Sequence, residues 1–232
     1  MAHDIILYIG FAQPDEWPSW AGTYARHAQR FEEASGGVAC LVLPFHHVTP
    51  ERIARIAPRA VVFSGFARSW EQYDPRSFDG VAAYIDQATD TPMLGLCGSH
   101  QLFGFHFSGG LRSSEGLRDQ PMRSRRPGEP IVNPDYHPEF FMERGFYELT
   151  LQTPDPIFDG CGRPPVVYES HYCEVKALPP GFTLLASTPD CRIQAMRHGS
   201  RPLVGLQFHP EDYTDRFPDG RTILRNFLRA TD

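Results

Sequence analysis

The stretch from residue 92 to residue 101 reads PMLGLCGSHQ. Its first five residues form a short apolar run that is typical of a buried strand. Cys97 follows at once, with the small residues Gly95, Gly98 and Ser99 at positions −2, +1 and +2. Small residues there let a strand and the following helix approach closely around a strained turn, which exposes the side chain at its tip.

A cysteine at the start of a helix is favoured in its thiolate form, because the helix dipole and the free N–H groups stabilise negative charge. The pattern therefore predicts a nucleophile at Cys97. Taken alone, the same residues also fit a buried structural cysteine beside a glycine turn.

Short apolar runs alternate with helical patterns through residues 1–96. Gly36 and Gly37 close the first helical pattern, whereas Thr49 and Pro50 suit the N-cap and the first position of the second. Short apolar strands separated by helices imply parallel β-α-β units covered on both faces. The predicted strands are residues 5–9, 38–43, 60–63 and 92–96, and the predicted helices are about 17–34, from 49–51 onward, and about 77–88.

The pattern breaks at about residues 112–142, a stretch rich in Pro, Arg, Gly and Ser. It is longer than most connections, so we interpret it as an atypical loop insertion. A solvated loop is the simplest interpretation, and a phosphate site or an acidic partner surface is the alternative. Five arginines carry that alternative: Arg112, Arg118, Arg123, Arg125 and Arg126.

The remaining chain predicts more strands and a last amphipathic helix. With 232 residues, the chain suits one domain over residues 1–232. We predict an α/β fold, a doubly wound and mostly parallel sheet with helices on both faces and a small antiparallel extension. The later elements are strands at 145–151, 166–169, 182–186 and 193–196, a strand at 203–208 that closes the sheet, and a helix at 221–228.

Composition excludes several classes of function. A net charge of −6 argues against nucleic acid or an anionic membrane as the main partner. There is no apolar run of about 18 residues and no signal-peptide pattern, so we expect no membrane span and a cytoplasmic protein. Five widely spaced cysteines without a CxxC pair predict neither a disulfide framework nor a structural zinc site. We expect no metal at His46, His47 or His106 and no cofactor.

A second motif lies at residues 205–211, which read GLQFHPE and again follow an apolar run. Pro210 biases His209 toward an extended backbone. Residues two apart on an extended segment point to the same side, so Glu211 can reach one imidazole nitrogen of His209. The other nitrogen is then free to take a proton from a thiol. By itself the tripeptide also fits a surface turn.

The two motifs support each other because both follow predicted strands. The carboxyl ends of parallel strands meet at one edge of the sheet, where ligands bind. We therefore predict that Cys97 is the nucleophile, His209 the base and Glu211 the orienting carboxylate of an enzyme that attacks an amide carbonyl. His100, inside the first motif, is interpreted as a packing residue at the start of the helix.

These motifs resemble those of a known family. Residues 95–101 resemble the G-x-C-x-G-x-Q nucleophile turn of class I (triad-type) glutamine amidotransferase domains, and residues 205–211 are similar to their G-x-Q-F-H-P-E signature. The resemblance covers nearly the whole chain, including the Glu169-Ser170-His171 element and the turn at 178–182. It implies the flavodoxin-like class I glutamine amidotransferase fold.

The resemblance also implies an activity. Cys97 would attack the side-chain amide of glutamine and release ammonia, leaving a γ-glutamyl thioester for water to hydrolyse. Gly98 would supply one oxyanion N–H, and Gln101 would help to hold the glutamine. The backbone around Ser170, His171 and Tyr172 would contact the α-amino and α-carboxylate groups.

Two departures from the family pattern concern the site. Ser99 stands where the family usually has glycine, and the family's Ser-Gly-Gly-Pro loop reads Ser64-Gly65-Phe66-Ala67. Gly65 and Phe66 would face the oxyanion, but phenylalanine resists the φ > 0 conformations open to glycine. The oxyanion hole is then formed differently, assembled by a partner or absent. Trp70 and Tyr73 would either pack this loop down or shape a pocket for something larger than glutamine.

Three functions fit these observations. The first is a glutaminase component that supplies ammonia to a synthase on a separate protein, because no synthase domain is fused here. The second is a stand-alone hydrolase of γ-glutamyl amides or peptides with the same triad and a wider pocket. The third is a catalytically silent regulatory subunit, which has no need of all three triad residues.

Overall fold

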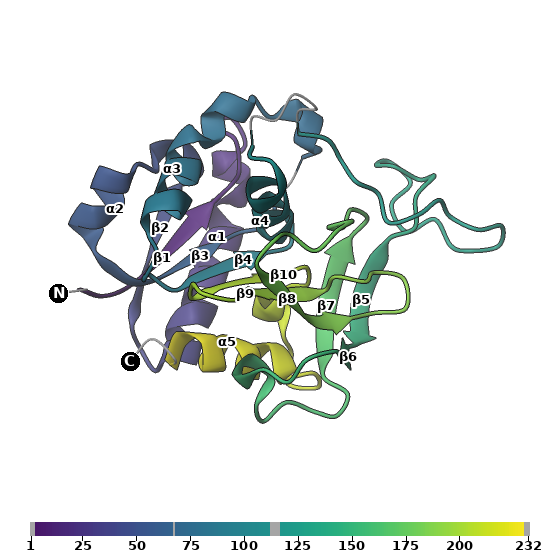
Figure 1. Cartoon of the computed structure of the whole chain (residues 1–232). Helices are drawn as coiled ribbons and strands as arrows, with labels where there is room; N and C mark the ends of the chain where they lie inside the picture. Colours follow the sequence, from purple (N-terminus) through teal and green to yellow (C-terminus); the bar gives the residue numbers. More distant parts are fainter. Residues whose placement is uncertain (1–2, 67, 112–116, 230–232) are drawn as a thin grey trace.

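The strands form one large mixed sheet and one small sheet. The computed structural model describes residues 3–66, 68–111 and 117–229. The large sheet has the strand order β2-β1-β3-β4-β10-β9-β8-β6 (Figure 1), and the small one pairs β5 with β7. The strands are β1 (His3–Gly10), β2 (Ala39–Pro44), β3 (Pro58–Phe63), β4 (Met93–Leu96), β5 (Glu143–Glu148), β6 (Thr150–Leu151), β7 (Val166–His171), β8 (Phe182–Ser187), β9 (Ala195–His198) and β10 (Leu203–Leu206).

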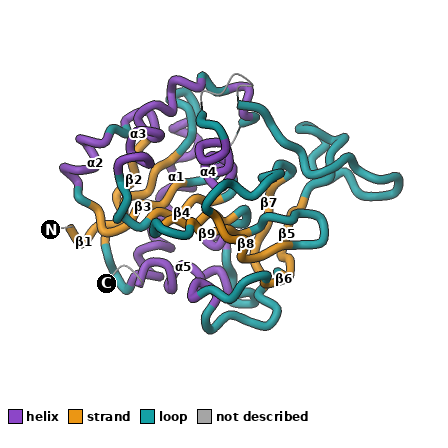
Figure 2. The backbone as a smooth tube through the Cα atoms, in the orientation of Figure 1, coloured by secondary structure: helices purple, strands orange, loops and turns teal. Residues whose placement is uncertain are grey.

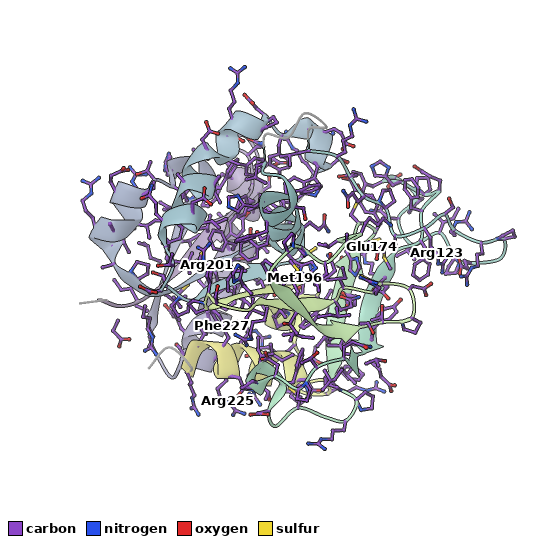
Figure 3. All side chains as sticks on the ribbon, viewed as in Figure 1. Arg123, Glu174, Met196, Arg201, Arg225 and Phe227 are labelled. Carbon is purple, nitrogen blue, oxygen red and sulfur yellow. The ribbon has the colours of Figure 1, made fainter. Side chains whose placement is uncertain are left out.

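Helices cover both faces of the large sheet, as the doubly wound prediction requires (Figure 1). Side chains of α2, α3 and α4 join one buried core, and those of α1 and α5 join the other. Phe227 of α5 belongs to the second core (Figure 3). The helices are α1 (Trp17–Ser35), α2 (Pro50–Ile56), α3 (Asp79–Gln87), α4 (Gly98–Ser108) and α5 (Asp219–Arg229). Short 3-10 turns lie at Phe45–His47, Trp70–Gln72, Pro75–Phe78, Pro156–Phe158 and Pro210–Asp212.

Strand β1 shows why its run is apolar at every position. Ile6 and Tyr8 pack into the core beneath α1 and α5, and Leu7 and Ile9 pack into the opposite core. Successive side chains of a strand point to opposite faces, so a strand covered on both sides needs apolar residues throughout. Full burial of one such side chain stabilises the fold by about 1.5–3 kcal/mol.

The predicted helix ends are confirmed. Gly36 ends α1 with a φ of 85°, a left-handed conformation that suits glycine. The Thr49 hydroxyl accepts a 3.2 Å hydrogen bond from the Arg52 N–H, and Pro50 is the first residue of α2.

The prediction of one strand over residues 145–151 is wrong, because the chain changes sheets there. β5 pairs with β7, whereas Thr150 of β6 pairs with Ser187 at the edge of the large sheet. Leu149 lies between the two strands, buried, and its N–H donates to the Pro165 carbonyl at 2.8 Å. No turn residue separates Glu148 from Thr150 in the sequence, so the local pattern does not mark the switch.

Strand β10 does not close the sheet at an edge. It pairs in parallel with β4 and in antiparallel with β9, with Gly205 opposite Gly95. All four residues of β10 are buried, as expected for a central strand. This position brings the carboxyl ends of β4 and β10 side by side, as the two motifs predict.

The segment from residue 117 to residue 142 contains no helix or strand and projects from the body beside β5 (Figure 2). We call residues 117–142 the excursion; Arg112 lies outside the described residues. An isolated bridge from Pro121 to Cys173 joins the excursion to the segment after β7, and a second bridge, from Ser124 to Phe140, lies within the excursion. Arg123 is bonded to Glu129 within it. Across the three described ranges, no helix is long and apolar enough to cross a membrane.

Candidate active site

Cys97 occupies a sharp turn between β4 and α4. Its φ of 49° and ψ of −106° lie in a region that L-residues avoid, at a cost of about 1–3 kcal/mol. Strand and helix meet so closely that a Cβ at Gly95 would lie 2.5 Å from Phe103 Cε2. A Cβ at Gly98 would lie 2.0 Å from Phe66 Cδ2. The small residues around Cys97 are therefore a steric requirement of the turn.

The two central strands also need glycine beneath the helix. A Cβ at Gly205 would lie 2.6 Å from His100 Nδ1. His100 is fully buried, and its Nε2 lies 3.0 Å from the Ile193 carbonyl. Burial lowers the pKa of His100 to about 3, so its ring is neutral. His100 is a packing residue of α4, as predicted.

Cys97, His209 and Glu211 come together at the ends of β4 and β10. His209 Nδ1 lies 2.8 Å from Glu211 Oε1, and the thiol of Cys97 is within hydrogen-bonding reach of the His209 ring. The backbone N–H of His209 donates to the Tyr168 carbonyl at 2.8 Å, which fixes the ring over the site. A Cβ placed on Gly65 would lie 3.2 Å from His209 Cε1 and 3.9 Å from Cys97 Sγ, so Gly65 closes one side.

The charges of the site favour a protonated His209. Burial lowers the pKa of His209, but the charges of Glu211 and Cys97 outweigh burial and raise that pKa well above its usual value. An imidazolium beside a thiolate is the reactive form of a cysteine nucleophile. Glu211 is itself buried, so its carboxylate acts with little screening by water.

A polar group lies behind Glu211. His27 of α1 places Nδ1 4.0 Å from Glu211 Oε1 and Nε2 3.8 Å from Asp212 Oδ1. The Tyr8 hydroxyl is 3.0 Å from His27 Nδ1. Burial, followed by the charge of Glu211, raises the pKa of Tyr8 well above its usual value, so the phenol stays neutral.

Gln207 is a site residue that the sequence reasoning does not single out. Its side-chain amide donates toward Cys97 Sγ at 3.7 Å and accepts from Gln101 Nε2 at 3.3 Å. Gln101 also accepts from Trp70 Nε1 at 2.9 Å and donates to the Cys173 carbonyl at 3.2 Å. Gln101 is predicted to hold substrate, but its amide is already bonded within the protein. Gln207 is two residues before His209, and this period-two spacing is the signal that could have identified it.

The loop after β3 brings Phe66 beside Gly98. A Cβ on Gly98 would lie 2.8 Å from the Phe66 backbone nitrogen. Across the described part of the chain, the N–H groups of Phe66 and Gly98 have no hydrogen-bond acceptor. Neither Gly65 nor Phe66 has a positive φ. This loop therefore does not require glycine at position 66. Two free N–H groups thus lie next to the nucleophile.

Aromatic side chains pack against Phe66 and hold the loop after β3 against the body of the protein. The Phe66 ring lies 4.4 Å from Phe11, 4.4 Å from Trp70 and 5.3 Å from Tyr73, measured between ring centroids. The Ser99 hydroxyl donates a short hydrogen bond to the Ser64 carbonyl. Ser99 therefore ties the nucleophile helix to the loop, which the usual glycine has no side chain to do.

A cavity of about 120 Å³ opens next to Cys97. This volume is well below the roughly 300–1,000 Å³ of pockets for drug-sized ligands, so the cavity suits a small molecule. The excursion contributes Asp119, Tyr136 and Met142 to it, none of which is predicted from sequence. The predicted residues in its lining are Phe66, Cys97, Gly98, Gln101, Ser170, His171 and Tyr172.

Asp119 is held in this lining by its neighbours. It accepts from the Trp70 N–H at 2.7 Å and from the Tyr172 hydroxyl. Arg68, also in the lining, is bonded to Glu16 at 2.6 Å and to Asp15 at 3.0 Å. Neither Asp119 nor Arg68 gives a pattern in the sequence, because both lie in irregular segments.

The other cysteines are not activated. Cys173 also lines the cavity, and burial raises the pKa of its thiol. Burial raises the pKa of Cys40 and of Cys161 to about 12. Among the described residues, one set of side chains could offer ligands to a metal ion: Glu143, His171 and Cys191. One possible ligand atom from each of the three lies within 4.8 Å of the other two. Both Glu143 oxygens already accept hydrogen bonds, so we assign no ion there.

Comparisons with known proteins show the family to which the chain is similar. The family model "Glutamine amidotransferase class-I" matches residues 27–231. The glutamine-hydrolyzing GMP synthase subunit of Thermococcus kodakarensis is 32% identical over 195 residues, which cover 82% of this chain and 85% of that protein. The glutamine-hydrolyzing GMP synthase of Caldicellulosiruptor saccharolyticus is 27% identical over 98% of this chain but only 36% of its own length.

Solved structures share the fold. A Thermoplasma acidophilum protein described as a candidate subunit of GMP synthase superposes with a TM-score of 0.70 at 24% identity, over 100% of this chain and 96% of that one. A glutamine amidotransferase from Thermotoga maritima gives a TM-score of 0.60 at 15% identity, over 99% and 98% of the two chains.

Proposed function

This chain belongs to the class I glutamine amidotransferase family, and from that premise we propose that it hydrolyses the side-chain amide of glutamine and supplies the ammonia to a separate synthase. The observation that carries the proposal is the convergence of Cys97, His209 and Glu211, with Cys97 in the lining of a small cavity. The same cavity borders two free backbone N–H groups, those of Gly98 and Phe66.

The reaction starts with the ion pair of Cys97 and His209. The thiolate attacks the δ-carbon of glutamine, and the carbonyl electrons move onto oxygen. His209 gives its proton to the nitrogen as the C–N bond breaks, so ammonia leaves and a γ-glutamyl thioester remains. His209 then takes a proton from water, the hydroxide attacks the thioester, and glutamate leaves as the thiolate reforms.

The free N–H groups of Gly98 and Phe66 suit the negative oxygen that forms in both steps. They are preorganised, because Gly98 begins α4 and the Ser99 hydroxyl of that helix donates a hydrogen bond to the Ser64 carbonyl in the loop that holds Phe66. Removing one such donor typically costs about 10²–10³ in rate. In this proposal Phe66 replaces the glycine of the family loop without loss of the donor.

The charged lining supports an amino-acid substrate. The Asp119 carboxylate borders the cavity and suits an α-ammonium group. Ser170 and Tyr172, at the end of β7, line the same cavity and suit the other end of the amino-acid group. Gln101 acts indirectly in this account, by holding Trp70 and Gln207 in place.

The size of the cavity favours glutamine over a longer γ-glutamyl compound. The hydrolase alternative needs a wider pocket, and the aromatic residues that would form one pack against each other instead. A silent regulatory subunit has no need of a strained Cys97 or of a carboxylate bonded to His209.

A separate partner is part of the proposal. The Thermococcus kodakarensis relative is named as one subunit of a glutamine-hydrolyzing GMP synthase, and the Caldicellulosiruptor saccharolyticus relative is a longer GMP synthase of which this chain covers 36%. By analogy, we propose that the ammonia acceptor of this chain is bound by a second protein. The synthase component of GMP synthase is the first candidate to test.

The test is an assay of ammonia release from glutamine, by the chain alone and with the candidate synthase, together with cleavage of a γ-glutamyl anilide. The control pair is Cys97→Ser and Cys173→Ser, because both cysteines line the cavity and only Cys97 contacts His209. Ammonia release that rises with the partner and is lost only in Cys97→Ser supports the proposal. Efficient anilide cleavage by the isolated chain would favour the hydrolase.

A further inference from the structure

Three ionisable side chains lie together in the interior behind the substrate cavity. His171 Nε2 is 3.0 Å from Glu143 Oε2 and 3.1 Å from Glu169 Oε2. The three residues are 1%, 0% and 4% exposed for Glu143, Glu169 and His171. We call these three side chains the buried charge cluster. Its members are almost fully buried, yet the mechanism proposed above uses none of them as a reacting group.

The register of the small sheet brings the cluster together. Glu143 of β5 lies directly opposite His171 of β7, and Glu169 is two residues earlier on β7. Side chains at opposite positions and at period two share one face of a sheet. This face turns inward, against the segment from residue 188 to residue 194.

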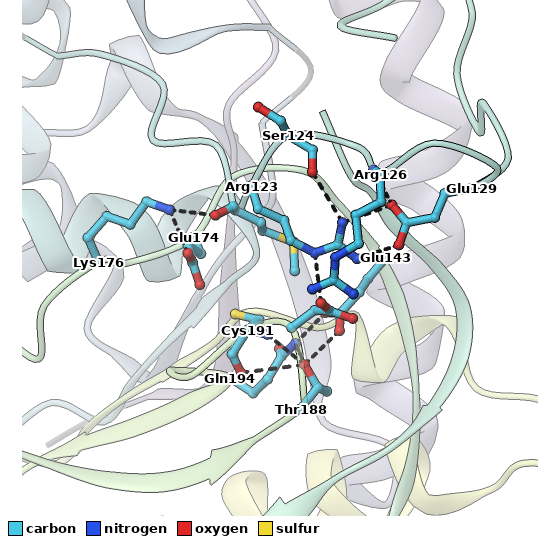
Figure 4. A network of polar contacts seen from close by, with 12 residues as sticks. Arg123, Ser124, Arg126, Glu129, Glu143, Glu174, Lys176, Thr188, Cys191 and Gln194 are labelled. Carbon is cyan, nitrogen blue, oxygen red and sulfur yellow. Dashed lines mark hydrogen bonds and ion pairs between the residues drawn. The ribbon is translucent and has the colours of Figure 1, made fainter. Parts of the chain in front are cut away.

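The hydrogen-bond donors around the cluster are unequally shared between Glu143 and Glu169. Glu143 accepts from the Thr188 hydroxyl at 2.6 Å and from Gln194 Nε2 at 2.7 Å (Figure 4). Apart from its contact with His171, Glu169 has no hydrogen-bond partner for either oxygen among the described residues. His171 uses its other nitrogen on the Cys173 carbonyl, at 2.9 Å. One N–H of His171 therefore serves two carboxylates.

This arrangement has a definite charge requirement. With His171 protonated and Glu143 ionised, the cluster is neutral only if Glu169 carries a proton. Burial raises the pKa of Glu169 to about 7, although the contact with His171 opposes this. Burial lowers the pKa of His171, but both carboxylates outweigh it and raise that pKa to about 10.

Other charged groups around the cluster belong to elements already described. The charge of His209 lowers the pKa of Glu169, and that of Glu143 raises it. On the remaining sides the cluster is faced by Tyr147 of β5, His100 of α4 and Cys191 in the 188–194 segment, with Glu174 beside Cys191. Burial raises the pKa of Cys191 and of Tyr147 and lowers the pKa of His100, so these three side chains stay neutral.

The cluster is joined to both walls of the substrate cavity. Ser170, His171 and Tyr172 line the cavity, and Ser170 lies between two members of the cluster in the chain. Met142, which precedes Glu143, lines the cavity from the excursion. The cluster is therefore continuous in the chain with lining residues from β7 and with one from the excursion.

We propose that Glu143 and Glu169 are positioning residues for substrate binding, which act through His171 to hold the cavity wall, and that the wall is held in place only while Glu169 keeps its proton. Ionised Glu169 would compete with Glu143 for one N–H, and a buried carboxylate without a donor of its own is costly. The inference rests on the proposed function, because glutamine is the ligand that reports the state of the wall.

The test measures glutamine affinity by calorimetry in a Cys97→Ala background, where binding occurs without turnover. Affinity is followed from about pH 5.5 to about pH 8.5, on either side of the pKa of Glu169. A coupling of one pKa unit corresponds to a tenfold change, so we expect the Kd to rise about tenfold over this range. Glu169→Gln keeps the shape of the side chain and cannot ionise, so its Kd is expected to stay nearly constant.

The matched control is Glu148→Gln, which removes an exposed carboxylate from the far end of β5 and keeps the pH dependence. A Kd that does not change with pH in the Cys97→Ala background with Glu169 intact overturns the inference, even if Glu169→Gln fails to fold. An unchanged pH dependence in Glu169→Gln also overturns it. Absence of glutamine binding at every pH, together with no ammonia release by the wild type, contradicts the proposed function as well.

Discussion

The backbone N–H of Cys97 donates a 2.7 Å hydrogen bond to the carbonyl of Leu206. This bond joins the nucleophile turn to the last residue of β10, three positions before His209. It fixes the distance between nucleophile and base through the sheet rather than through flexible side chains. It also occupies the Cys97 N–H, so the oxyanion donors that we propose are the N–H groups of Gly98 and Phe66.

Glu211→Gln is expected to lower kcat/KM by about 10³-fold or more, as for the third residue of other triads. The Glu211 charge raises the pKa of His209, so its removal lowers that pKa and moves the alkaline limb of the activity profile to lower pH. The measurement is kcat/KM for ammonia release across pH. Asp212→Asn is the control, since Asp212 is adjacent but bonds toward His27. Equal losses in both variants would argue against a specific role for Glu211.

Gly98→Ala is expected to reduce kcat by about 10²–10³-fold, because the new methyl group would displace the Phe66 loop and one oxyanion donor with it. Gly22→Ala is the matched control in α1, where a Cβ meets nothing within 4 Å. That control is expected to keep full activity and to gain about 0.4–1 kcal/mol of stability. Full activity in Gly98→Ala would show that this loop does not take part.

Phe66→Gly separates packing from chemistry. The substitution removes a half-buried ring from the aromatic group of Phe11, Trp70 and Tyr73, so we expect unfolding free energy to fall by about 2 kcal/mol. The backbone N–H remains, so kcat is expected to change by less than about tenfold. Urea denaturation and ammonia release measure the two effects. A large loss of kcat in a folded variant would mean that the ring itself shapes the catalytic geometry.

Stability is expected to fall as pH rises, first through Glu169 and then, above neutral pH, through His171. The pKa of Glu169 is raised from 4.5 to about 7, so its contribution is fully present below the lower value and is lost by the time the pH reaches the higher one. The pKa of His171 is raised to about 10, and its contribution is likewise lost as pH rises through that value. The loss of stability is measured as a fall in melting temperature, by about 2–4 °C for each kcal/mol of unfolding free energy. A melting temperature that rises between neutral pH and pH of about 9 would contradict the charge assignment.

The strand ends are predictable from sequence, and so is the meeting of Cys97 with His209. A short apolar run followed by a small-residue turn is a local signal, and parallel strands bring their carboxyl ends together whatever their order. The order itself is not predictable in detail: the sequence pattern predicts that the strand at 203–208 closes the sheet, whereas β10 lies at its centre. The position of β10 depends on packing across both faces of the sheet, and this packing cannot be read from any single segment of the sequence.

The interior of the site is harder to predict. Glu143 precedes the expected strand at 145–151, whereas in the structure it starts β5 and faces His171 across the small sheet. Asp119 lies in an irregular segment without periodicity, and only the folded chain brings it to the cavity. The family loop pattern suggests a defect at Phe66, but the backbone there provides a free N–H without a positive φ.

The proposed chemistry is tested most directly by asking which side chain forms the thioester. A glutamine-derived electrophile is added to the wild type in the presence of the candidate synthase, and the modified peptide is identified by mass spectrometry. We predict one adduct, on Cys97, that is abolished in Cys97→Ser and slowed in Glu211→Gln. Labelling of Cys173 in place of Cys97, or no adduct at Cys97 with the partner present, would contradict the proposed function.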